Sequence, residues 1–190
     1  MEFYESSNEA GFKYRKRGLA MKRFFITSAI ILLCFLMQTT LFQHLALAGE
    51  VPNLILIIVV AFAYMRGRKA GMYYGFACGL LIDLVYGDVV GLNALLYVLV
   101  GYLVGICNEI YYRDELSVPI ILIAISDFLF NFAYYIFNFL LRGRLQVFYY
   151  IWNVILPEVV YTVLVACILY KLLYSLNYWL ERNEETEEVL

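Results

Sequence analysis

The sequence predicts an all-α integral membrane protein with six transmembrane helices and both termini in the cytoplasm. Hydrophobic residues make up 64% of the 190-residue chain, and the mean hydropathy is +0.76. Soluble domains are nearer half apolar, and here the excess lies in long runs. Charged residues are only 16% of the chain and collect in short clusters between these runs. Such a pattern is typical of helices that cross a lipid bilayer several times.

Each apolar run is assigned as one transmembrane helix, in the order 24–45, 52–65, 70–86, 91–111, 119–141 and 157–176. The second run begins at Pro52, which suits the first turn of a helix. It is about 14 residues long, or roughly 21 Å at the helical rise. A re-entrant hairpin of runs two and three would place three basic residues in hydrocarbon, at a cost of several kcal/mol. Two thin spans joined by a cytoplasmic loop are therefore expected.

The segment before the last span, 145–156, is rich in Tyr and Trp and reads LQVFYYIWNVIL. Aromatic residues of this kind gather at membrane interfaces, so an interfacial segment is expected here, with the last span beginning at Pro157. The alternative is one long helix with a kink at Pro157.

Basic residues set the predicted orientation, because cytoplasmic loops carry an excess of Lys and Arg. Six spans with a cytoplasmic N-terminus leave only Arg142 and Arg144 on the outer side, a split of 12 to 2 among the 14 basic residues. The chain then divides into a disordered cytoplasmic extension (1–20), a membrane domain (21–180) and an acidic cytoplasmic tail (181–190).

A ladder of small residues marks the third and fourth spans. Steps of four residues stack on one face of an α-helix, and small residues there let neighbouring helices approach closely. Packing within one subunit is the expected use of this strip, and a homodimer contact is the alternative. The helix-packing glycines are Gly71, Gly75, Gly79, Gly91, Gly101 and Gly105.

Asp83 continues the strip at the same spacing, as a carboxylate in an otherwise apolar span. Charged groups inside a membrane are costly, face the bundle interior or a water-filled cavity, and are functional-site candidates. The predicted topology places Asn53, Asp83, Asn93 and Glu158 in the outer half of four helices. They are interpreted as an outward polar pocket or docking surface, with helix caps as the alternative.

The fifth span carries a polar stripe in which Asp127 and Asn131 lie nearer the middle of the membrane. This stripe is expected either to form hydrogen bonds between helices or to face a partner, and the residues alone favour neither. Asp127 and Asn131 join the four outer residues as candidate partner or pocket residues.

Several function classes are excluded. His44 is the only histidine, which argues against sites that need two imidazoles. The four cysteines lie in four different apolar runs without metal-ligand spacing. The chain has no lysine-bearing phosphate loop and no Ser-centred elbow. No enzyme activity, cofactor or nucleic-acid partner is therefore expected.

Residues 21–181 resemble MreD, the small multi-span rod shape-determining protein of bacteria. The strongest resemblance is YGFACGLLIDLVYGDVVGLNALLYVLVGYLVG, at 74–105, which is similar to the family's Gly-Phe-x-x-Gly-Leu-x-x-Asp segment. The basic start MKRFF, the Pro52-Asn53 pair and Pro157 also fit. The first 20 residues depart from the family pattern.

The resemblance implies a multi-pass protein of the bacterial plasma membrane, in the machinery that inserts side-wall peptidoglycan during cell elongation. It implies an MreC-like partner, the RodA-type glycosyltransferase with its penicillin-binding transpeptidase, the MreB filament on the inner face, and membrane lipid. It carries over no catalytic residue. The family is also similar in layout to the six-helix substrate-binding subunits of vitamin transporters, so a transport subunit is the alternative. The single alanine of the first span, Ala29, counts modestly against transport.

Overall fold

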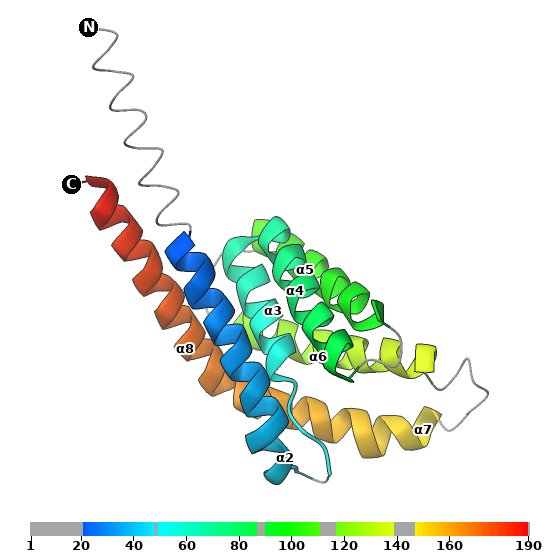
Figure 1. The fold of residues 1–190 in the computed structure, drawn as a ribbon. Helices are drawn as coiled ribbons and strands as arrows, with labels where there is room; N and C mark the ends of the chain where they lie inside the picture. The colour runs from blue at the N-terminus through cyan, green and yellow to red at the C-terminus, as the bar shows by residue number, and fades with distance from the viewer. Residues whose placement is uncertain (1–20, 48, 87–89, 111–116, 139–146, 190) are drawn as a thin grey trace, which may run out of the picture.

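The computed structural model describes all residues except 1–20, 48, 87–89, 111–116, 139–146 and 190. Within this part the chain is helical, and the only strand-like pairing is one bridge between Leu47 and Glu50. The helices, seen in Figure 1, are the first helix (Met21–His44), α3 (Leu54–Arg66), α4 (Arg68–Tyr86), α5 (Leu92–Ile110), α6 (Ser117–Asn138) and a last helix built from α7 (Val147–Tyr150), a π-helical turn (Ile151–Ile155) and α8 (Leu156–Val189).

The predicted disorder of residues 1–20 and the end of the fifth span beyond 138 lie outside the described residues. The predicted acidic tail, by contrast, falls largely within α8, which continues as helix to Val189.

Among the described residues, three helices are long and apolar enough to cross a membrane: Met21–His44, Ser117–Phe137 and Val147–Leu180. Two shorter apolar helices accompany them, at Leu54–Arg66 and Leu92–Asn108. The all-helical membrane class is thus confirmed, whereas six full spans with cytoplasmic termini stay a prediction.

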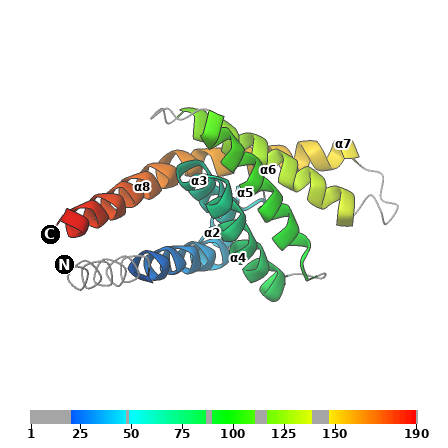
Figure 2. The same cartoon turned by 90° about the horizontal axis from the view of Figure 1, so that it is seen from above.

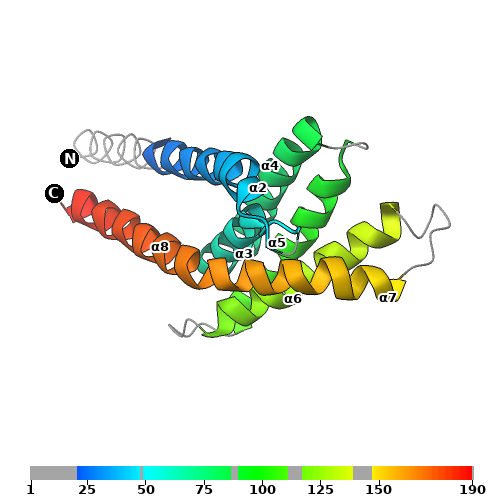
Figure 3. The same ribbon diagram turned by 90° about the horizontal axis from the view of Figure 1, so that it is seen from below.

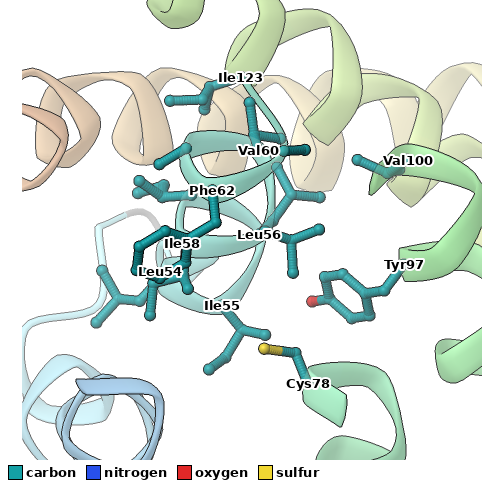
Figure 4. Close-up of a cluster of buried hydrophobic side chains, with 14 of the residues drawn as sticks. Leu54, Ile55, Leu56, Ile58, Val60, Phe62, Cys78, Tyr97, Val100 and Ile123 are labelled. Carbon is teal, nitrogen blue, oxygen red and sulfur yellow. The ribbon is translucent and has the colours of Figure 1, made fainter. Parts of the chain in front are cut away.

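The short helix α3 is the centre of the molecule. Every residue from Leu54 to Tyr64 is buried, because α4, α5, α6 and α8 all pack against it. Figure 2 shows α3 in the middle of the helices, and Figure 4 shows its side chains meeting Cys78 of α4, Tyr97 of α5 and Ile123 of α6. A helix that is apolar all round is a core helix, which explains the uninterrupted apolar sequence from Leu54 to Tyr64.

The last helix passes through Pro157 without ending, so the structure has the long-helix alternative and not a helix start at Pro157. The turn just before the proline is π-helical, with the Leu156 N–H bonded to the Ile151 carbonyl. Proline has no N–H to donate, and a widened turn next to it accommodates this break in the helical ladder. Figure 1 shows the resulting bend between α7 and the C-terminal part of α8.

The first helix and α8 run side by side in opposite directions, as Figures 1 and 3 show. At one end Arg23 donates to the Asn177 side chain, at 3.5 Å. At the other end the Tyr161 hydroxyl donates to the Leu45 carbonyl, at 3.0 Å, and its ring meets Phe42. The start of the first helix and the end of α8 therefore lie at the same end of the molecule.

Candidate functional site

Asp83 lies one turn before the end of α4 and is only 2% exposed. Its two carboxylate oxygens accept four hydrogen bonds, from the backbone N–H groups of Gly91, Asn93 and Ala94 and from the Asn93 side chain, at 2.9–3.1 Å. The first N–H groups of a helix have no partner within that helix. Asp83 therefore caps α5 from the neighbouring helix, where the positive end of the α5 dipole favours a carboxylate.

The glycine ladder lies between α4 and α5. A Cβ on Gly71 would overlap the Gly101 carbonyl, and a Cβ on Gly75 would overlap the Tyr97 backbone. Gly79 is equally close to the backbone of Ala94. The two helices can approach to this distance only because these positions lack side chains.

The remaining two glycines of the predicted set behave differently from each other. Gly105 lies against the backbone of Arg68, so it belongs to the same α4–α5 contact. Gly91 has open space around it and a φ of +104°, so it serves the turn that leads into α5.

A second group of buried polar residues surrounds the start of α3. Asn53 caps this helix by accepting the Leu56 N–H at 3.1 Å. The same Asn53 oxygen accepts the Tyr97 hydroxyl of α5 at 2.9 Å, and the Asn53 N–H donates to the Thr162 hydroxyl of α8 at 3.1 Å. One residue thus links α3 to two other helices.

The first helix contributes to the same region. Its Gln38 side chain accepts the Ile55 N–H of α3 at 3.1 Å. Gln38 lies in a π-helical segment, Met37–Leu41. The N-terminus of α3 is buried, so its N–H groups cannot bond to water and need such partners.

Asp127 of α6 is fully buried beside Asn53. Its Oδ1 accepts two long hydrogen bonds, from the side-chain amides of Asn53 at 3.5 Å and Asn131 at 3.4 Å. Its Oδ2 is buried and has no hydrogen-bond partner in the described part of the chain, although the hydroxyl of Thr162 faces this carboxyl group.

Glu158, at the start of α8, adds a second carboxyl group to this region. It is half-buried, neighbours Asp127, and its side chain faces Asn131. Glu50, in the loop before α3, is also close to Glu158, and burial raises the pKa of Glu50 above its ordinary value.

The opposite end of α3 carries Arg66. Its guanidinium lies over the Phe62 ring, 4.5 Å from the centroid. Its Nε donates to Asn177 of α8 at 2.9 Å, and another of its nitrogens donates to the Tyr74 hydroxyl. Arg66 therefore joins α3, α4 and α8. It lies at the C-terminus of α3, where the helix dipole favours a positive charge.

The six candidate partner or pocket residues, four predicted in the outer half of the membrane and two nearer its middle, are divided between two clusters. Asp83 caps α5 and accepts from Asn93 in its first turn, whereas Asn53, Asp127, Asn131 and Glu158 lie together where α3, α6 and α8 meet. Three further residues, Tyr97, Thr162 and Gln38, belong to these contacts and are not among the residues predicted from the sequence. Their only signal was a polar atom in an apolar run, which is common for Tyr and Thr.

The described residues contain no group of three or more His, Cys, Asp or Glu side chains placed to hold a metal ion. Their buried polar side chains are used mainly to bond helices of the same chain to one another. The fold and these contacts define a class: a small helical membrane protein built round a buried central helix.

Comparison with known proteins gives the family. The model of the family described as rod shape-determining protein MreD matches residues 20–178. The chain therefore belongs to the MreD family and is a rod shape-determining membrane protein. No curated protein and no solved structure matches it.

Proposed function

We propose that this chain is a non-enzymatic scaffold of the bacterial cell-elongation complex, placed in the plasma membrane to hold an MreC-like protein. The wider assembly would include a RodA-type glycosyltransferase with its penicillin-binding transpeptidase, and MreB on the inner face. Family membership supports the role in cell shape.

The observation that carries the scaffold proposal is how the buried polar groups are used. Asp83 is occupied by four hydrogen bonds to α5, and Asn53 and Arg66 each link three helices. These contacts stabilise one arrangement of helices and leave apolar faces on the outside. A fixed helical body with apolar faces suits the binding of partner spans in a membrane, where close packing drives association.

Three such faces are stripes of exposed aliphatic residues at a spacing of four. They lie on α5 (Leu95, Leu99, Leu103), on α6 (Ile121, Ile125, Leu129) and on α8 (Leu164, Ile168, Leu172). Each is suited to lipid or to a partner span.

The first test is gentle purification of the tagged chain from its native cell, with mass spectrometry of the proteins that accompany it. Stoichiometric recovery of an MreC-like protein is expected. Recovery of an ATPase pair with a membrane coupling subunit, or of a tightly held vitamin, would instead support a transport subunit and contradict the scaffold.

A matched set of variants then locates the partner face. Leu99→Trp, Ile125→Trp and Ile168→Trp each add bulk at the centre of one stripe without disturbing the buried core. One of them is expected to lose the MreC-like protein while its membrane level stays normal. Retention of the partner by all three would exclude these faces as its binding surface.

A further inference from the structure

Two buried aspartates of this chain, Asp83 and Asp127, differ in the number and length of the hydrogen bonds that they accept. Asp83 receives four hydrogen bonds at 2.9–3.1 Å, shared between both of its oxygens. Asp127 receives only two, at 3.4 and 3.5 Å, both on Oδ1, while Oδ2 is buried without a partner among the described residues. An ionised carboxylate buried in this way costs free energy unless donors or cations compensate it.

The backbone N–H groups at the start of α3 do not compensate a negative charge on Asp127. Its first N–H groups are already bonded to neutral acceptors: Leu54 to the Pro52 carbonyl, Ile55 to Gln38, and Leu56 and Ile57 to Asn53. No N–H of this turn is left for Asp127, in contrast to the α5 turn that binds Asp83.

Positively charged side chains do not compensate a negative charge on Asp127 either. No Lys, Arg or His of the described residues forms an ion pair or hydrogen bond with Asp127. The titratable groups that face the region are Glu158 of α8, Glu50 of the preceding loop and the hydroxyl of Tyr97 on α5. Two of these are carboxyl groups, which disfavour a further negative charge.

A metal cation is also poorly suited to the site. Such an ion needs several free oxygen ligands. The Asn53 oxygen already accepts two hydrogen bonds, and Asn53 and Asn131 present their NH₂ groups, not their oxygens, to Asp127.

We propose that Asp127 is a proton-binding site: a carboxylic acid that carries a proton on Oδ2 and donates it to the Thr162 hydroxyl, at the junction of α3, α6 and α8. The Thr162 oxygen accepts the Asn53 N–H and has a second lone pair for this bond. The proton removes the buried charge and gives the isolated oxygen a partner. This inference does not depend on the scaffold function.

Infrared spectroscopy of the purified full-length chain in lipid nanodiscs at neutral pH tests the site directly. Exposed carboxyl groups are ionised at this pH and do not absorb in the protonated-acid region. A protonated-acid band is expected that shifts on labelling with ¹³C-aspartate and disappears in Asp127→Asn. Absence of an aspartate band, or its persistence in Asp127→Asn, would overturn the assignment.

Thermal unfolding gives an independent readout that uses Asp83 as a matched comparison. The amide of Asn resembles a protonated carboxyl group, because it is neutral and places an acceptor oxygen beside an NH₂ group that can donate to Thr162. Asp127→Asn is therefore expected to unfold within experimental error of the parent. Asp83→Asn, which places an NH₂ group against N–H donors, is expected to lose several degrees. An equal loss in both variants, or failure of Asp127→Asn to fold, would contradict a protonated Asp127.

The same measurement distinguishes a proton from a metal cation. The unfolding temperature of the parent chain is expected to be unchanged when sodium in the buffer is replaced by choline at constant ionic strength. A sodium-dependent stabilisation that Asp127→Asn removes would replace the proton with a sodium site and overturn the proposal.

Discussion

Asp83 of α4 and Asn93 of α5 are joined by two hydrogen bonds, because the Asp83 Oδ1 accepts both the Asn93 backbone N–H at 3.1 Å and its side-chain amide at 3.0 Å. With Oδ2 bonded to Gly91 and Ala94, one carboxylate binds three backbone N–H groups at the start of α5. The residue that the sequence marks as the most unusual charge in the membrane is therefore a cap between two helices.

Asp83→Asn is expected to lower the free energy of unfolding by about 2 kcal/mol, since hydrogen bonds to charged groups contribute about 1.5–3 kcal/mol. Chemical or thermal unfolding of the purified chain in detergent measures this. Asn93→Ala removes only one side-chain bond and is expected to cost about 1 kcal/mol. Parent-like stability of Asp83→Asn would mean that the cap contributes little.

Gly79→Leu is expected to prevent the close approach of α4 and α5 and to reduce the amount of folded protein recovered. The Cβ alone would overlap the backbone of Ala94, which cannot move aside as a flexible side chain can. Overpacking of a close contact typically costs about 1–3 kcal/mol or more. Yield and unfolding temperature in detergent are the measurements.

Ala77→Leu is the matched control for this substitution. Ala77 lies on the same helix, two residues away, and is exposed. The substitution places a larger side chain on the outer face of α4 and is expected to leave the unfolding temperature unchanged. Equal effects of Ala77→Leu and Gly79→Leu would show that the glycine contact is not what limits the packing.

The helical membrane class could be predicted from the sequence because apolar runs and small-residue spacing are local signals. The role of α3 as the buried centre could not. The 12 residues of α3 before Arg66 are apolar all round, and that pattern also fits a thin helix in lipid. Whether protein or lipid surrounds such a helix depends on how the other helices pack round it. The periodicity of a single helix carries no information on that packing.

The candidate site shows the same limit. The sequence places Asn53 and Glu158 at similar depths along their helices, but depth gives no information on which helices are in contact. Asp83 and Asn53 were therefore expected together, whereas contacts separate them into a cap of α5 and a cap of α3. Pro157 was expected to begin a helix, and the π turn before it lets the helix continue.

Tyr97→Phe is expected to destabilise the chain by about 1 kcal/mol, because it removes the hydroxyl that donates to Asn53 and leaves the ring in place. Tyr97 is almost fully buried, so water cannot replace the lost donor. Tyr102→Phe, on the outer side of the same helix, is expected to have little effect. No difference between the two variants would exclude a stabilising Tyr97–Asn53 bond.

Arg66→Lys is expected to destabilise the chain by about 1–2 kcal/mol although it keeps the positive charge at the end of α3. The planar guanidinium of Arg66 lies over Phe62 while it donates to Asn177 and Tyr74, and one ammonium group cannot make all three contacts. Lys69→Arg, three residues along the chain at an exposed position, exchanges the same two kinds of cation and is the control, expected to be neutral. If the two variants unfold alike, charge alone accounts for Arg66; if only Arg66→Lys is weakened, its geometry joins α3, α4 and α8.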